Sequence, residues 1–220
     1  MTPAAHAPSR LSCPTPPLDL ATLLGPAAWQ RLPAAVRRRF AAGHAPATYP
    51  GTLTMRCSAI GRVFAAGAAL LGSPLCGARA SAVPATVQVQ ADGRGGVSWT
   101  RRLQLPGRRS VQIRSTKALG PDGRLIERTD GGLGMALEVF EQHGALVFES
   151  RRYDWWLGRW RLPVPALLTP GTCRVTHEDL GQGRFRFTLE MRHAWWGRTF
   201  HQTGVFTDPP HTQTDQELLP

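Results

Sequence analysis

Lysine is almost absent from this 220-residue chain. Lys117 is the only lysine among 26 lysine and arginine residues, so the net charge of +11 comes almost entirely from arginine. The arginines are scattered in single positions and short runs such as 37–39 and 108–109. Proteins that bind nucleic acid usually gather their positive charge on one face or along one element. Two explanations of the positive charge are possible: the arginine- and alanine-rich composition that a GC-rich genome produces, and a surface that binds nucleic acid. The scattered arginines favour the first.

Cysteine is scarce, and its spacing excludes the sites that cysteine commonly builds. No CxxC pair occurs, which argues against a zinc site, and a disulfide framework is not expected in a chain of this length. The four cysteines are Cys13, Cys57, Cys76 and Cys173. We expect them to be reduced thiols in a cytoplasmic protein.

Signatures of enzymes and cofactor sites are also missing. The sequence contains no GxSxG, HExxH or P-loop pattern. The glycines of "DGGLGMA" at 130–136 lack the strand–turn–helix context of a nucleotide-binding loop and are typical of a hairpin turn. We therefore expect no metal and no cofactor, and the sequence favours a binding protein over an enzyme.

Long apolar runs are absent as well. The most apolar stretch, residues 59–75, is interrupted by Arg62 and falls short of the roughly 20 residues that cross a bilayer as a helix. The N-terminal "MTPAAHAPSRLSCPTPP" has no continuous apolar segment of the secretory type. These absences also predict a cytoplasmic protein.

The pattern of the chain divides it into three segments. Residues 1–17 are rich in proline and alanine without periodicity, and predict a disordered lead-in. Residues 18–207 have the length and composition of a single α+β domain. Residues 208–220 are polar and predict a flexible tail.

Helical patterns are confined to the first third of the domain. Residues 19–40 predict a pair of short helices, with Asp19 as N-cap, a break at Gly25-Pro26 and Pro33 before a helix at 34–40. Residues 47–57 predict an extended strand, and 58–71 predict a further helix.

From residue 85 onward the apolar period changes to two, which is typical of strands. The short turns between them, such as Asp92-Gly93 and Asp122-Gly123, indicate an antiparallel meander. Since sheet twist accumulates, about nine such strands predict a strongly curved, barrel-like sheet with N-terminal helices, either lipocalin-like or helix-grip-like. The proline-rich segment 154–171 predicts a long loop across the barrel mouth or a sheet edge. The candidate strands are 85–90, 97–103, 110–116, 124–129, 135–141, 145–151, 173–177, 184–192 and 199–206.

The two-residue period also assigns side chains to faces, and it turns charged residues inward. Trp99 and Leu103 share a face with Arg101, whereas Arg102 points to solvent. The same argument carries Glu127 and His193 to the apolar side of their strands, with Ser115 nearby.

Two interpretations of the inward arginine remain open. Arg101 and Glu127 could form a buried ion pair that ties the barrel together. Alternatively, Arg101 presents its donors to the polar or anionic head of an apolar small molecule, while Trp99 packs on the ligand and Glu127 orients the arginine. The predicted ligand-binding residues are Arg101, Trp99, Glu127, Ser115 and His193.

Two further functions compete with ligand binding. Glu127 and His193 could transfer protons in an enzyme or in an accessory domain of an oxidoreductase system, whereas His177 and His201 are weaker candidates. The net positive charge could instead bind nucleic acid or an anionic membrane. Five tryptophans pack against the barrel or form an aromatic lip, helped by the arginines at 151, 152, 159 and 161, for an apolar ligand or for a membrane surface. They are the tryptophans at 155, 156 and 160 in the proline-rich segment and those at 195 and 196 in a late turn.

Several landmarks occur in an order that resembles a known bacterial family. They are "LLGPAAWQRLPAAVRRRF", "YPG" at 49–51, "WTR" at 99–101, "LIER" around Glu127, "RLPVPALLTPG" and "GRFRFTLEMRHAWWGRTFHQTG". The chain resembles the family called domain of unknown function 4166 over roughly residues 20–207. Members of that family stand alone or follow an NAD(P)-binding, dehydrogenase-like domain, which implies an oxidoreductase partner. The resemblance supplies no catalytic residue.

Overall fold

The structure is a computed structural model that describes residues 17–43, 45–72, 75–107 and 109–210. Residues 1–16 of the predicted lead-in and 211–220 of the predicted tail lie outside the described residues, as does Cys13.

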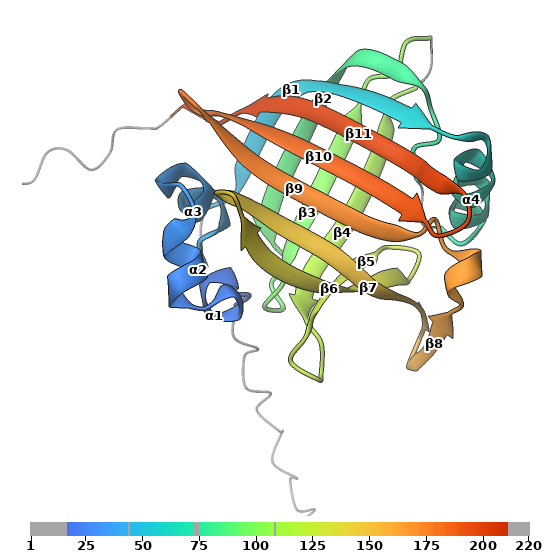
Figure 1. Ribbon diagram of the computed structural model, residues 1–220, viewed down its shortest axis with the longest axis horizontal. Coiled ribbons are helices and arrows are strands. Elements are labelled where there is room, and N and C mark those ends of the chain that lie inside the picture. The colour runs from blue at the N-terminus through green and yellow to red at the C-terminus, as the bar shows by residue number, and fades with distance from the viewer. Residues whose placement is uncertain (1–16, 44, 73–74, 108, 211–220) are drawn as a thin grey trace, which may run out of the picture.

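The described strands form one antiparallel sheet that closes on itself. Ten of its eleven strands follow one another around a ring in chain order, and the ring closes where β11 pairs with β1 and where β6 pairs with β7 (Figure 1). The sequence-based expectation of a strongly curved, barrel-like antiparallel sheet is thus confirmed. The strands are β1 (Ala47–Cys57), β2 (Ala80–Ala91), β3 (Val97–Leu103), β4 (Val111–Leu119), β5 (Leu125–Thr129), β6 (Leu133–Gln142), β7 (Ala145–Leu157), β8 (Trp160–Val164), β9 (Thr172–Gly181), β10 (Arg184–His193) and β11 (Gly197–Thr207).

The expected loop at 154–171 is wrong in part. This segment holds the last residues of β7, the short strand β8 and a 3-10 helix, η1 (Ala166–Leu168). β8 pairs with β7 alone, so its free edge accommodates Pro163, which has no backbone N–H to donate. Proline therefore marked an edge strand here, and not a loop.

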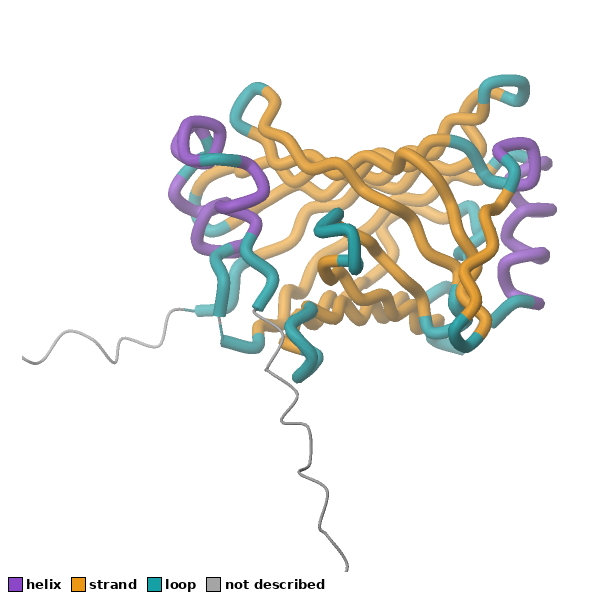
Figure 2. Tube along the Cα trace, turned by 90° about the horizontal axis from the view of Figure 1, so that it is seen from below, coloured by secondary structure: helices purple, strands orange, loops and turns teal. Residues whose placement is uncertain are grey.

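The helices lie at the two ends of the barrel, as Figure 2 shows. α1 (Leu20–Leu24), α2 (Pro26–Arg31) and α3 (Ala34–Phe40) cover one end, called here the α3 end, and α4 (Ala59–Leu70) covers the other, the α4 end. No helix of the described residues runs along the concave side of the sheet. The closed ring in chain order is therefore nearer to the lipocalin-like alternative than to the helix-grip alternative, with ten strands in place of eight.

The helix boundaries follow from local capping. The Asp19 side chain accepts a hydrogen bond from the backbone N–H of Ala21 at 2.9 Å, and Pro26 stands in the first turn of α2. The Ser58 hydroxyl accepts from the N–H of Gly61 at 3.0 Å and begins α4. These groups satisfy helix N–H groups that have no partner within the helix.

α3 is fastened to the rim of the barrel by a buried arginine. The side chain of Arg39 is 5% exposed and donates to Asp208 after β11 at 2.6 Å and to Asp179 of β9 at 2.9 Å. This bidentate arrangement holds the helix over the mouth of the barrel.

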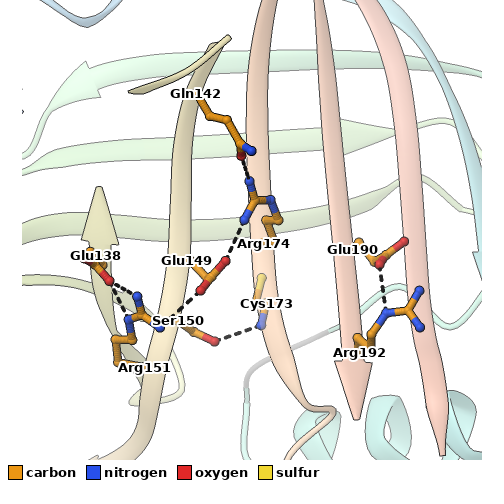
Figure 3. A network of polar contacts seen from close by, with 9 residues as sticks. All are labelled: Glu138, Gln142, Glu149, Ser150, Arg151, Cys173, Arg174, Glu190 and Arg192. Atoms are coloured by element: carbon orange, nitrogen blue, oxygen red, sulfur yellow. Dashed lines mark hydrogen bonds and ion pairs between the residues drawn. The ribbon is translucent and has the colours of Figure 1, made fainter. Parts of the chain in front are cut away.

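Polar side chains connect the strands on both sides of β7 (Figure 3). β7 pairs with β9 only over Leu146–Glu149, and beyond that point the Ser150 hydroxyl accepts from the backbone N–H of Cys173 at 2.8 Å. Arg151 bridges Glu138 and Glu149, and Arg174 bridges Glu149 and Gln142. These contacts link β6, β7 and β9 where the β7–β9 pairing ends.

Candidate functional site

Strand register places the polar lumen residues side by side. Lys117 on β4 stands opposite Glu127 on β5, and Trp99 on β3 stands opposite Ser115 on β4. Because residues two apart on a strand share a face, Ser115 and Lys117 point to the same side. Ser115, Lys117 and Glu127 are all buried in the barrel.

Glu127 is the centre of this cluster. Its Oε2 atom lies 3.0 Å from Nζ of Lys117, and its Oε1 atom accepts a hydrogen bond from the Ser115 hydroxyl at 2.6 Å. Nη2 of Arg101 lies 4.0 Å from Oε1. The predicted Arg101–Glu127 pair therefore exists as a long contact, and the closer cation is Lys117.

The electrostatics of the cluster keep the carboxylate ionised. Burial alone would raise the pKa of Glu127, but the positive charges of Lys117 and Arg101 and the hydrogen bond from Ser115 bring that pKa to about 2. Burial lowers the pKa of Lys117, and the negative charge of Glu127 opposes this effect. Two basic groups, Lys117 and Arg101, therefore face the single carboxylate of Glu127.

The ammonium of Lys117 also rests between aromatic rings. Nζ lies 5.2 Å from the ring centroid of Trp99 and 5.2 Å from that of Phe148, within the range of cation–π attraction. Lys117 was not among the predicted site residues, because the expected strand ended at residue 116. The available signal was its place in the two-residue period after Ile113 and Ser115.

A cavity of about 190 Å³ leads from the α3 end of the barrel to Lys117. Leu18, Phe40 and the β2–β3 turn form its outer part, and Trp99, Phe148 and Lys117 line it from inside. A second void of about 20 Å³ lies next to Arg101 and His177. The side chain of Trp99 lines both spaces.

Two polar atoms in this region have no hydrogen-bond partner among the described residues: Nε1 of Trp99 and Nδ1 of His177. His177 is buried among aromatic rings, the nearest being Phe40, whose ring centroid is 4.8 Å away. Burial, followed by the positive charges of Lys117 and Arg101, lowers the pKa of His177 to about 3, so the ring is neutral near neutral pH. The sequence ranked His177 low because a strand position does not reveal which rings surround it.

His193 lies in a different environment from the other predicted site residues. Its ring stacks on Trp196 at 4.2 Å between centroids and on Phe64 of α4 at 6.2 Å, and its Nδ1 accepts from the Trp195 N–H at 3.1 Å. Trp99, Arg101, Ser115 and Glu127 come together in the lumen, whereas the contacts found for His193 include none of them. Proton transfer between Glu127 and His193 stays a prediction.

The described ranges also bear on metal binding and on membrane crossing. No three His, Cys, Asp or Glu side chains there converge as metal ligands would. No helix of those ranges combines the length and apolar character needed to cross a bilayer.

Residues 32–206 match the family model described as "Domain of unknown function (DUF4166)". No curated protein matches the chain in sequence.

Proposed function

The chain belongs to the DUF4166 family, whose description names no activity, and we propose that it binds a small apolar molecule with an anionic head inside its barrel. The head lies between Lys117 and Arg101, and the body occupies the cavity under α1 and α3.

The charge balance of the lumen is the observation that carries this proposal. Lys117 and Arg101 bring two positive charges to one carboxylate, that of Glu127. A buried charge without a counter-charge is costly, so a site with one excess positive charge favours an anion. A ligand carboxylate between the two cations supplies the missing charge.

The cavity limits the size of the ligand. Its volume of about 190 Å³ is close to the roughly 150 Å³ of a cavity known to hold benzene and below the ~300–1,000 Å³ of pockets for drug-sized ligands. A single-ring or short-chain acid fits it. The walls formed by Leu18, Leu20, Val89 and Phe148 suit an apolar body.

The polar atoms around the cavity suit recognition of oxygen atoms. Trp99, which lines both the cavity and the smaller void, adds an indole N–H that has no partner among the described residues. Arg101, which lines the smaller void beyond Trp99, offers a planar fork of donors. Glu127 holds both cations toward the lumen. Each group therefore has a role in fixing the head of the ligand.

Binding is favoured over catalysis by the protonation states of the lumen. Glu127, with a pKa of about 2, is ionised at neutral pH and has no proton to donate. Burial, together with the charge of Glu127, raises the pKa of the Cys173 thiol to about 12, so it is a poor nucleophile. At neutral pH Glu127 is a fixed negative charge and Cys173 a neutral thiol, so neither group suits proton transfer or nucleophilic attack.

The proposal extends to a partner and a place. The family resemblance implies that in some members this domain follows an NAD(P)-binding, dehydrogenase-like domain. The ligand is therefore proposed to pass to an oxidoreductase. The thiols of Cys57, Cys76 and Cys173 are free, which agrees with the reducing cytoplasm.

Calorimetric titration with benzoate and with benzyl alcohol tests the proposal, because the two probes differ mainly in the charge of the head. Benzoate is expected to bind and benzyl alcohol to bind far more weakly. Arg101→Met and Lys117→Met are each expected to weaken benzoate binding by about tenfold to a hundredfold, the loss of one charged hydrogen-bond contact of ~1.5–3 kcal/mol.

Arg102→Met is the matched control, since Arg102 is the exposed neighbour on the same strand. It should leave benzoate binding unchanged. Equal binding of both probes, or unchanged benzoate binding in Arg101→Met and Lys117→Met, would refute the proposal. Native mass spectrometry of protein purified from its own host then identifies the natural ligand.

A further inference from the structure

We propose that the α4 end of the barrel is a docking surface for a membrane that contains anionic lipids. This surface consists of α4, the β7–β8 hairpin, η1 and the β10–β11 turn. It is independent of the cavity, which opens at the opposite end.

Exposed apolar side chains are concentrated at this end. Of the twelve large apolar side chains that the described residues expose, ten belong to these four elements or to the residue after α4. Leu119 and Val205, the other two, are only 37% exposed. Single exposed apolar side chains scattered over a protein surface are normal, but a cluster of them on one side marks an interaction site. The ten are Val63, Leu70, Leu71, Leu157, Trp160, Leu162, Leu167, Leu168, Trp195 and Trp196.

The elements that carry these side chains are neighbours in space. Phe64 of α4 contacts Trp196 of the β10–β11 turn at 5.6 Å between ring centroids. The indole N–H of Trp155 on β7 donates to the carbonyl of Gly131, whose Cα lies next to Gly72 after α4. In Figure 1, α4, β8 and the segment after β8 lie together at one end of the molecule.

α4 is oriented with its small residues toward the barrel. Its buried positions are Gly61, Ala65 and Ala68, whereas Val63 and Leu70 are 64% and 89% exposed. A helix of a globular protein normally turns its large apolar side chains inward. Phe64 follows this rule and packs against the core, whereas Val63 and Leu70 form an exposed apolar stripe on the other side of the helix.

The charge of the same end identifies that partner. Arg62, Arg79 and Arg159 are exposed there, and within the described part of the chain no carboxylate lies within 4.0 Å of them. The guanidinium of Arg159 lies 5.4 Å from the ring centroid of Trp160. Tryptophan, leucine and arginine on loops and one short helix are the combination that binds the interface of an anionic bilayer, where indole rings lie at headgroup level and arginines meet phosphate.

Docking in this orientation turns the α3 end, and with it the mouth of the cavity, toward the aqueous phase. The ligand would then enter from solution and not from the bilayer. This agrees with a cavity too small for a diacyl lipid.

Co-sedimentation of the full chain with vesicles tests the surface. Vesicles of phosphatidylcholine mixed with phosphatidylglycerol should bind the protein, vesicles of phosphatidylcholine alone should bind it weakly, and added salt should reduce binding. The double variant Trp160→Ser/Leu168→Ser should bind at least about tenfold more weakly, because burial of one large apolar side chain is worth ~1.5 kcal/mol or more. Both side chains are mostly exposed, so the fold should be retained.

A variant of one basic residue of the surface tests the role of charge. Arg159→Gln should weaken binding to the mixed vesicles by about fivefold, the effect of one basic residue near an anionic surface. Arg94→Gln and Leu119→Ser, at the opposite end of the barrel, are the matched controls and should have no effect. The proposal is overturned if neither vesicle binds the protein. It is also overturned if analytical ultracentrifugation shows a dimer that Trp160→Ser/Leu168→Ser dissociates while vesicle binding is unchanged, because the surface would then join two copies of the chain.

Discussion

Glu127 and its two cations explain how a charged cluster is tolerated inside an apolar barrel. The carboxylate accepts from Ser115, lies 3.0 Å from the Lys117 ammonium and 4.0 Å from the Arg101 guanidinium. Such a cluster is sensitive to the loss of one member, because the remaining charges lose their compensation while they stay desolvated. The ammonium of Lys117, the only lysine of the chain, lies between the rings of Trp99 and Phe148 and pairs with this carboxylate. An ammonium is more compact than a guanidinium and suits this position.

Replacing the shared carboxylate is the sharpest test at the residue scale. Glu127→Gln should lower the free energy of unfolding by about 3–5 kcal/mol, since it leaves the buried Lys117 and the partly buried Arg101 without a counter-charge. Benzoate should restore more stability to this variant than to the wild type. Urea titration with and without benzoate measures both effects.

The control is Glu138→Gln, which removes an exposed partner of Arg151. An exposed pair is worth up to about 1 kcal/mol, so this variant should remain close to wild type. Equal losses in the two variants would show that the lumen cluster is not specially stabilising.

At the scale of elements, α4 is positioned by close backbone packing against β11. A Cβ atom at Gly61 would lie 2.3 Å from the carbonyl oxygen of Thr199, whereas a Cβ at Gly67 would meet no atom within 4 Å. The two glycines of this helix therefore differ in their surroundings. Gly61 permits the close approach of α4 to β11, whereas a side chain at Gly67 would meet no neighbouring atom.

Alanine substitution in α4 should separate these roles. Gly61→Ala should destabilise the protein by ~1–3 kcal/mol, because the helix must move away from β11. Gly67→Ala should stabilise it by up to about 1 kcal/mol through higher helix propensity. Thermal unfolding followed by circular dichroism measures both, and destabilisation by Gly67→Ala would contradict the assigned packing.

The whole molecule is a closed barrel with two different ends. Closure through β1–β11 and β6–β7 pairs the strands around the ring, so the ring itself has no free edge for aggregation. The α3 end contains the cavity mouth, and the α4 end carries the exposed apolar and basic side chains. The buried cluster between them makes global stability depend on pH.

His177 sets the direction of that dependence near neutral pH. Its pKa is about 3 in the folded protein against roughly 6.5 when unfolded. Between these values the unfolded chain binds a proton that the folded chain does not, so the contribution of His177 to stability is complete above about pH 6.5 and falls as the pH decreases. Glu127, whose pKa is about 2 when folded, adds to this loss only below about pH 4.5.

Unfolding by urea at several pH values checks this dependence. Between pH 6.5 and 5 the wild type should lose roughly 2 kcal/mol through His177. His177→Leu should remove most of this slope, whereas His143→Asn, in an exposed turn, should keep it. A slope that survives in His177→Leu would assign the acid sensitivity to other groups.

Local sequence patterns predicted most of the strands, turns and helix caps of this protein. The period of two carried Arg101, Ser115 and Glu127 to one side of the sheet, because alternation is a property of every extended backbone. Asp19 and Ser58 marked helix starts because a capping side chain acts within a few residues of itself. Each of these features depends on neighbours in the chain.

Only the tertiary structure decided which inward side chains meet. The register of β4 against β5 joined Lys117 to Glu127, ring closure surrounded His177 with aromatic side chains, and the pairing of β8 with β7 replaced an expected loop. The exposure of Val63 and Leu70 on α4 was also decided by the tertiary structure, because periodicity does not show which side of a helix packs against the barrel. Register and closure are set by contacts between distant residues, and no local pattern encodes them.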